Sequence, residues 1–184
     1  GLAGMEAARV LAERGHQVAL YEKAEKLGGR WNIAALLKGR KEYTSLVGNL
    51  QRDLKRAKVQ VSLGKEVTPE IVAAARPDVA IVATGAAPAP LPVPGATGKN
   101  VVSAEDVLLG TARLGETVVV VGGVSPGVEV AYTLLGKCRR LCLVVAPELP
   151  SRNIYRSTYY AFRDNCAFTI PYYVGSTILE IRDA

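Results

Sequence analysis

The chain has 184 residues, of which 49% are hydrophobic and 22% are charged, values that exclude a disordered tail and a coiled coil. Its 23 basic and 17 acidic side chains give a net charge of +6. Glycine, proline or charge interrupts each apolar stretch before it reaches the roughly 18 residues of a membrane helix, so we expect a soluble globular protein without a membrane segment.

The first half of the chain predicts alternating helices and strands. Apolar residues recur at helical spacing from Gly4 to Gly15, a residue type that commonly ends helices. A second helix is predicted over 43–57, where an apolar stripe lies opposite a basic face. That stripe comprises Tyr43, Leu46, Val47, Leu50 and Leu54. Strands are predicted at 17–22, at 59–63 and, fully buried, at 78–84, and Thr68 and Pro69 mark the start of another helix.

Four prolines between residues 86 and 100 exclude a helix or a central strand there, so this stretch is predicted to be a linker. The predicted organisation is a first unit over 1–85, a linker over 86–115 and a second unit over 116–184. The later elements are a strand at Val101, a helix capped by Ser103, a strand at 117–121, a helix at 127–135, a strand at 141–145, a helix at 154–163 and two strand-like pieces ending at Ile181. Alternating strands and helices predict an α/β fold with doubly wound, Rossmann-like parallel sheets.

An internal repeat connects the two units. A shift of 123 positions aligns residues 4–8 with 127–131 and the strand at 18–21 with 141–144. In the second copy, a strand leads into Gly122-Gly123-Val124-Ser125-Pro126-Gly127, which has the register of a G-x-G-x-x-G turn. By the same offset, Gly1 and Gly4 are the second and third glycines of the first copy. We therefore expect that the chain is a fragment and that the first strand of its first unit is missing.

Such a turn is suited to binding a phosphate. The N-terminus of a helix offers unpaired N–H groups and a positive dipole end, and glycines let a pyrophosphate approach the backbone. Glu22 lies 18 residues after Gly4, where an acid that accepts hydrogen bonds from a ribose is expected. The first copy therefore predicts an adenosine nucleotide site, although Gly1 and Gly4 would equally allow close packing of a helix on the sheet.

Two further motifs make the assignment more specific. Residues 26–31 (KLGGRW) and 82–85 (VATG) resemble two signatures of flavoproteins with two dinucleotide-binding domains. From Gly1 to about Asp183 the chain is similar to the C-terminal part of the old-yellow-enzyme-type reductases, the family of 2,4-dienoyl-CoA reductase and trimethylamine dehydrogenase. The similarity also rests on residues 21–23 (YEK), 32–34 (NIA), 64–68 (GKEVT) and 101–108 (VVSAEDVL).

The resemblance implies a first unit that holds FAD, or only ADP, with an NAD(P)-binding unit inserted into it. In the full reductases, electrons pass from NADPH to FAD and through an iron–sulfur cluster to FMN in an N-terminal barrel domain, which is the expected partner of this chain. The implied cofactor-binding residues of the first unit are Gly1, Ala3, Gly4, Glu22, Lys23, Gly29, Arg30, Trp31, Val67, Ala83, Thr84 and Gly85. Those of the second unit are Gly122, Gly123, Ser125, Pro126, Gly127 and Arg152. Trp31 could equally be a half-buried core aromatic residue, and Arg30 a solvated charge.

The second copy departs from the pattern of a dinucleotide site. Val124 replaces the middle glycine, and its branched side chain would crowd a pyrophosphate. The following strand ends at Val145 and Ala146 without an acid for the ribose, and Arg152 is the nearby cation, although it would also fit an exposed surface. The second unit is therefore predicted to bind NAD(P)H weakly or not at all. The alternative to an oxidoreductase module is a structural ADP- or FAD-binding module.

Other functions have less support. Residues 1–60 hold 12 basic and 6 acidic side chains, but no nucleic-acid-reading motif accompanies them, so we expect a solvated face or a surface that docks the barrel. Cys138, Cys142 and Cys166 contain no C-x-x-C pair, which predicts neither a disulfide framework nor a zinc site and favours a reducing, cytoplasmic location. His16 lacks partners for a metal or catalytic role. No catalytic side chain is predicted, because the cofactors would perform the chemistry.

Overall fold

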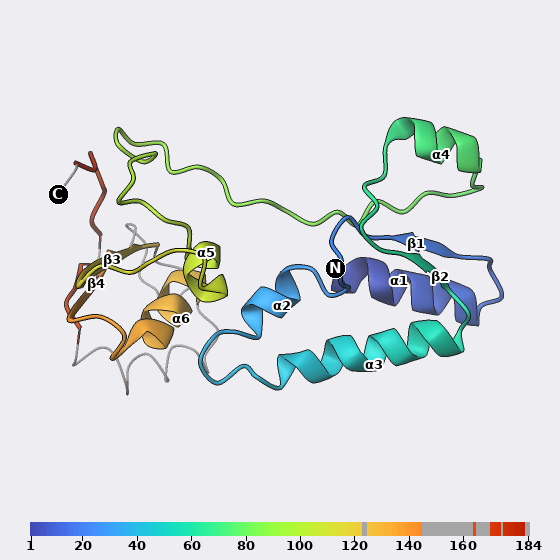
Figure 1. The fold of residues 1–184 in the computed structure, drawn as a ribbon, viewed down its shortest axis with the longest axis horizontal. Helices are drawn as coiled ribbons and strands as arrows, with labels where there is room; N and C mark the ends of the chain where they lie inside the picture. The colour runs from blue at the N-terminus through green and yellow to red at the C-terminus, as the bar shows by residue number, and fades with distance from the viewer. Residues whose placement is uncertain (123–124, 145–163, 165–169, 174, 183–184) are drawn as a thin grey trace. The chain divides into compact units, whose positions relative to one another are not determined.

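The computed structural model describes residues 1–122, 125–144, 164, 170–173 and 175–182 (Figure 1). The chain forms two compact units. Unit 1 consists of residues 1–35 and 39–88, and unit 2 consists of residues 36–38 and 89–184. Each unit has its own sheet and its own hydrophobic core.

Unit 1 contains two parallel strands and four helices. Its elements are α1 (Leu2–Glu13), β1 (Ala19–Tyr21), α2 (Arg30–Ala34), α3 (Tyr43–Arg56), β2 (Gln60–Ser62) and α4 (Pro69–Ala75). β1 and β2 pair in parallel with Ala19 opposite Gln60 and Tyr21 opposite Ser62. Pro69 is the first residue of α4, as predicted, because its missing N–H would have no partner in the first turn of a helix.

The core of unit 1 lies where α1 packs against α3 (Figure 1). Met5 and Ala8 of α1 are buried, and so are Val47, Leu50 and Leu54 of α3. These α3 residues belong to the predicted stripe, which confirms the amphipathic helix. The stripe is narrower than predicted, because the side chain of Leu46 is 41% exposed. The core therefore fixes α1, and with it the glycine-rich start of this helix.

Unit 2 contains a parallel three-stranded sheet. Its elements are α5 (Ala104–Leu109), β3 (Thr117–Val121), α6 (Ser125–Leu134), β4 (Arg140–Val144) and β5 (Tyr172–Tyr173). The strand order is β3-β4-β5, and β3 pairs with β4 so that Thr117 lies opposite Arg140. The predicted cap of α5 is confirmed, because the Ser103 hydroxyl oxygen accepts a hydrogen bond of 3.0 Å from the Asp106 N–H.

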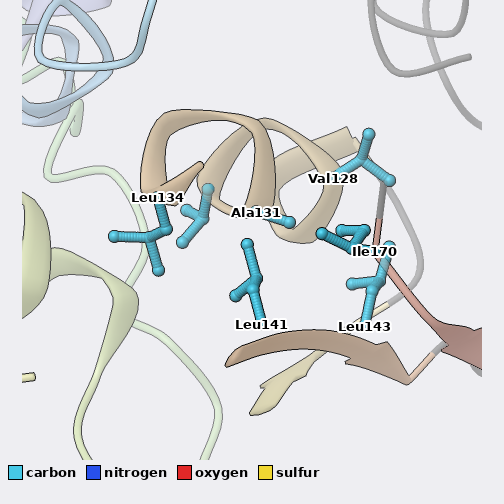
Figure 2. Packing of buried hydrophobic residues seen from close by; sticks show 7 residues of the cluster. Val128, Ala131, Leu134, Leu141, Leu143 and Ile170 are labelled. Atoms are coloured by element: carbon cyan, nitrogen blue, oxygen red, sulfur yellow. The ribbon is translucent and has the colours of Figure 1, made fainter. Parts of the chain in front are cut away.

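Helix α6 covers one face of this sheet, as Figure 2 shows. Val128, Ala131 and Leu134 of α6 face Leu141 and Leu143 of β4. Burying these side chains fixes the position of α6 on the strands. A fully buried Val or Leu side chain contributes roughly 1.5–3 kcal/mol to the stability of the fold. The described ends of the segment that joins β3 to α6, Gly122 after β3 and Ser125 at the start of α6, thereby lie at two elements that pack together.

Several predicted elements differ from the structure. The buried strand at 78–84 is wrong: the segment has no strand pairing within the described residues, and the side chains of Val79 and Val82 are 76% and 83% exposed. An apolar run becomes a strand only where a neighbour accepts its backbone hydrogen bonds. Val101 and Ile181 likewise lie outside strands. The predicted helix at 154–163 and Val145 lie outside the described residues.

Candidate functional site

The start of α1 has the geometry of a tight glycine turn. Gly1 is the N-cap residue of α1, and Gly4 is buried in its first turn. A Cβ atom added to Gly4 would lie 3.4 Å from Cβ of Ala83 and 3.6 Å from Cδ1 of Leu20. The chain segment with the VATG motif therefore passes directly beside the first turn of α1. Two of the motifs that the sequence separates by almost 80 residues meet at this point.

Glu22 faces this turn from the end of β1. Its Oε2 accepts a hydrogen bond of 3.1 Å from the Gly1 nitrogen, and its Oε1 accepts one of 3.1 Å from the Ala24 N–H. The side chain is 15% exposed. Burial by itself raises the pKa of Glu22, but the hydrogen bonds that its carboxylate accepts from the Ala24 N–H, the Gly1 nitrogen and the Lys23 N–H outweigh it, so the pKa is lowered. Glu22 is thus held as a carboxylate beside the turn.

The backbone around Glu22 is fixed by the strand that follows. The Glu22 N–H donates to the Ser62 carbonyl over 2.9 Å, and the Lys65 N–H donates to the Glu22 carbonyl over 3.0 Å. Gly64 has φ +62°, and a side chain there would meet the carboxylate of Glu25. The segment that contains Val67 therefore begins next to the end of β1.

The KLGGRW motif closes against the same turn. Gly29 has φ +53°, and a Cβ atom added to it would lie 2.9 Å from the Gly1 Cα. A residue with a side chain would thus be strained and would also displace Gly1. Gly28 has φ +111° and is buried, and the Asn32 amide secures this bend by donating to the Leu27 carbonyl over 2.9 Å.

Arg30 and Trp31, the first residues of α2, have different partners. Nη1 of Arg30 donates to the Ala86 carbonyl over 3.2 Å, which ties α2 to the residue after the VATG motif. Nε1 of Trp31 donates to the Tyr43 carbonyl over 3.0 Å. The rings of Trp31 and Tyr43 stack with centroids 4.4 Å apart and planes inclined by 14°. Trp31 is half-buried against the core of unit 1, which agrees with the alternative of a core aromatic residue.

The structure gathers part of the predicted set. Gly1, Gly4, Glu22, Gly29 and Ala83 meet at the start of α1. Apart from Arg30 and Trp31, the remaining predicted residues of unit 1 are exposed, namely Ala3, Lys23, Val67, Thr84 and Gly85. Sequence reasoning missed Ala86 and Tyr43, although the aromatic Tyr43 at the start of an amphipathic helix was a usable indication of a partner for Trp31.

Of the second glycine turn, the structure describes Gly122 and residues 125–127. Gly122 has φ +138°, and its N–H donates to the Val144 carbonyl over 3.0 Å. A Cβ atom added to Gly127 would overlap the Gly122 carbonyl oxygen, so only glycine fits at this position. Pro126 is exposed in the first turn of α6. Ser125 begins α6, while Gly123, Val124, Ala146 and Arg152 lie outside the described residues.

Within the described part of the chain, the other reactive side chains do not form a second site, and Cys166 lies outside it. Cys138 and Cys142 are free, and burial raises the pKa of both thiols, which disfavours the reactive thiolate. Among the described residues, no three His, Cys, Asp or Glu side chains are placed to hold a metal ion. An open depression of about 440 Å³, lined in part by Gly115, Lys137 and Arg139, lies at the amino ends of β3 and β4, away from the glycine turn. None of the helices in the described residues is long and apolar enough to cross a membrane.

The comparison with known protein families decides the class of this chain. Residues 1–153 match the pyridine nucleotide-disulphide oxidoreductase family. The chain belongs to this family. Its FAD/NAD(P)-binding, Rossmann-type fold and its oxidoreductase class, both predicted from the sequence, are thereby confirmed.

Curated relatives and solved structures are oxidoreductases too. The chain is 40% identical over 148 residues to an NADH oxidase of Thermoanaerobacter brockii, which covers 78% of this chain and 23% of the relative. It is 36% identical over 138 residues to a metal reductase of Desulforamulus reducens, a match that covers 73% of this chain and 21% of the relative. The fold resembles 2-naphthoyl-CoA reductase with a TM-score of 0.87 at 24% identity, covering 100% of this chain and 28% of that one. The fold also resembles histamine dehydrogenase from Rhizobium sp. 4-9, with a TM-score of 0.72 at 21% identity. This match covers 99% of this chain and 30% of that one.

The chain spans only part of the length of these proteins. The chain spans less than a quarter of the length of the two curated relatives, 23% and 21%. Both solved structures are below 25% identity, so they establish the fold alone.

Proposed function

We propose that unit 1 binds the adenosine diphosphate part of FAD, or ADP itself, at the start of α1. The observation that carries this proposal is the convergence of Gly1, Glu22, Gly29 and Ala83 around the first turn of that helix. Gly1, Ala3 and Gly4 would lie under the pyrophosphate, where helix N–H groups are available. The Glu22 carboxylate would accept the ribose hydroxyls in place of the Gly1 nitrogen or beside it.

The surrounding segments supply the rest of the site. Lys23 and the backbone of Val67 would lie at the adenine end, because both follow the fixed end of β1. Ala83, Thr84 and Gly85 would close over the pyrophosphate. Gly29, Arg30 and α2 would line the cofactor further along, towards the flavin. The fit is supported by Gly4 and Gly29, where added Cβ atoms would meet the Ala83 side chain or the Gly1 backbone.

We further propose that the chain is the reducing-equivalent input module of an old-yellow-enzyme-type reductase in the cytoplasm. FAD, when bound, would accept a hydride from NAD(P)H at unit 2 and pass electrons on to an iron–sulfur cluster and an FMN-containing barrel in the same protein. The motif order supports this proposal, and so do the fold likeness to 2-naphthoyl-CoA reductase and the longer curated relatives. This chain's own residues would bind and orient the nucleotides.

A second candidate is a structural ADP or FAD site combined with a degenerate second unit. The observation that favours it is Val124 at the middle position of the second turn, together with Ala146 where an acid would be expected. Arg152 is then the remaining candidate to contact a 2′-phosphate. In this case NAD(P)H would bind weakly or not at all.

Anaerobic titration of the purified full-length protein with NADH and NADPH tests both candidates. The visible absorbance of its flavins is followed, and its FAD content is measured after release. Bleaching of FAD by either nucleotide supports the reductase module. Retained FAD that neither nucleotide bleaches supports the structural site. A protein that binds neither FAD nor ADP would contradict both candidates.

A further inference from the structure

We propose that Tyr43 is a positioning residue for the flavin-bearing half of FAD, acting through Trp31 and α2. The inference rests on the proposed function, because it presumes that unit 1 binds FAD. It assigns a role to a residue that none of the sequence motifs contains. The contact that carries it is the parallel stack of Trp31 on Tyr43, at 4.4 Å, with the indole N–H bonded to the Tyr43 carbonyl.

Helix α2 depends on outside contacts for its position. It has only five residues, none of them fully buried, so its own hydrogen bonds are too few to hold it in place and its position depends on contacts with other segments. At its amino end, Gly29 abuts Gly1 and Arg30 is bonded to the Ala86 carbonyl. Trp31 makes the contact with the rest of the core, and Tyr43 covers its ring.

Tyr43 is well placed to be that anchor. It is the first residue of α3, whose Val47, Leu50 and Leu54 are buried in the core of unit 1. The Arg40 guanidinium lies 5.4 Å from the centroid of its ring. The contacts between Tyr43 and Trp31 use the ring and the backbone carbonyl, not the hydroxyl. A phenylalanine therefore preserves them, whereas an alanine removes the stack.

The two halves of FAD should respond differently. The adenosine and pyrophosphate end is proposed to meet Gly1, Gly4 and Glu22, which are held by α1 and β1. The flavin end is proposed to meet α2. A less firmly held α2 should therefore weaken the binding of FAD. The binding of ADP, which lacks the flavin, should be almost unaffected.

The test compares Tyr43→Ala and Tyr43→Phe with the unchanged full-length protein. Binding of FAD and of ADP to the FAD-free protein is measured by calorimetry. The Tyr43→Ala variant should bind FAD about two- to ten-fold more weakly, because it loses the aromatic stack. Binding of ADP should stay the same, and Tyr43→Phe should restore FAD binding. The matched control is Leu46→Ala, an exposed apolar residue one turn along α3, which should change neither affinity.

The outcomes separate this inference from the proposed function. An unchanged ratio of FAD to ADP affinity in Tyr43→Ala, including equal weakening of both, would overturn the positioning role. If the unchanged protein binds neither nucleotide, the proposed function fails, and the role of Tyr43 fails with it. Should Tyr43→Ala not fold, Tyr43→Leu keeps an apolar side chain without the stack and is scored by the same ratio. The visible circular dichroism of bound FAD, which reports flavin orientation, should change in the Ala or Leu variant and not in Leu46→Ala.

Discussion

The Gly1 nitrogen lies 3.1 Å from Oε2 of Glu22, so the acid at the end of β1 is directed at the first turn of α1. This relationship joins the two parts that recognition of an adenosine nucleotide requires, a helix N-terminus for phosphate and a carboxylate for ribose. Gly29 and Ala83 approach the same turn from the other two motifs. The proposed nucleotide site is thereby built from four chain segments rather than from the glycine turn alone.

Replacing Glu22 with alanine should weaken binding of both FAD and ADP. A hydrogen bond to a charged group contributes about 1.5–3 kcal/mol, which corresponds to a roughly ten- to hundred-fold loss of affinity. Calorimetry on the full-length protein measures the change. Glu25→Ala is the matched control, since Glu25 is an exposed acid three residues further on and should leave both affinities unchanged. Unaltered binding by Glu22→Ala would remove this residue from the site.

The lowered pKa of Glu22 predicts a pH dependence of stability. Because the folded protein favours the carboxylate, Glu22 contributes stability above its pKa in the unfolded chain. That contribution is lost as the pH falls through the lowered folded pKa. The difference in free energy of unfolding between the unchanged protein and Glu22→Gln should therefore be largest near neutral pH and shrink in acid. Urea titrations at a series of pH values measure it, and a constant difference would contradict the prediction.

Replacing Val124 with glycine should improve binding of NADPH, because a branched side chain at the middle position of a G-x-G-x-x-G turn would crowd a pyrophosphate. Relieving an overpacked position typically recovers about 1–3 kcal/mol, so the gain should be about five-fold or more. Equilibrium titration with NADPH measures it, and Val121→Gly in β3 should give no such gain. If the unchanged protein binds NADPH with micromolar affinity and Val124→Gly binds it no more tightly, the valine side chain does not obstruct the site.

The sequence predicted elements that carry a clear apolar pattern and missed contacts that only the folded chain brings together. α3 and β3 were found within one residue of their bounds, because an apolar stripe identifies a helix face and an apolar run identifies a strand. The burial expected of such a run is wrong for β3, in which Val119 and Val121 are exposed. The segment 78–84 has the same apolar character as β3 but no paired neighbour in the described structure, and composition alone could not reveal that. Helix α2 is too short to show periodicity.

The candidate site shows the same division. The positions of Gly4, Glu22 and Gly29 beside one turn could be predicted, because glycines and an acid at these spacings are characteristic of a dinucleotide-binding fold. The partners of Arg30 and Trp31 could not be predicted. Arg30 reaches a backbone carbonyl, which any residue type would provide, and Trp31 meets Tyr43 across a loop whose path only the folded chain defines.

Replacing Gly127 with alanine should destabilise unit 2. The added Cβ atom would overlap the Gly122 carbonyl oxygen, so α6 would have to move away from the strand that precedes it. Such overpacking typically costs about 1–3 kcal/mol. Gly115→Ala is the matched control, because the nearest atom to a Cβ there is 3.7 Å away and the backbone does not have positive φ. Urea unfolding of both variants measures the cost. The control should unfold like the unchanged protein, and equal stability of the two variants would show that the turn accepts a side chain at Gly127.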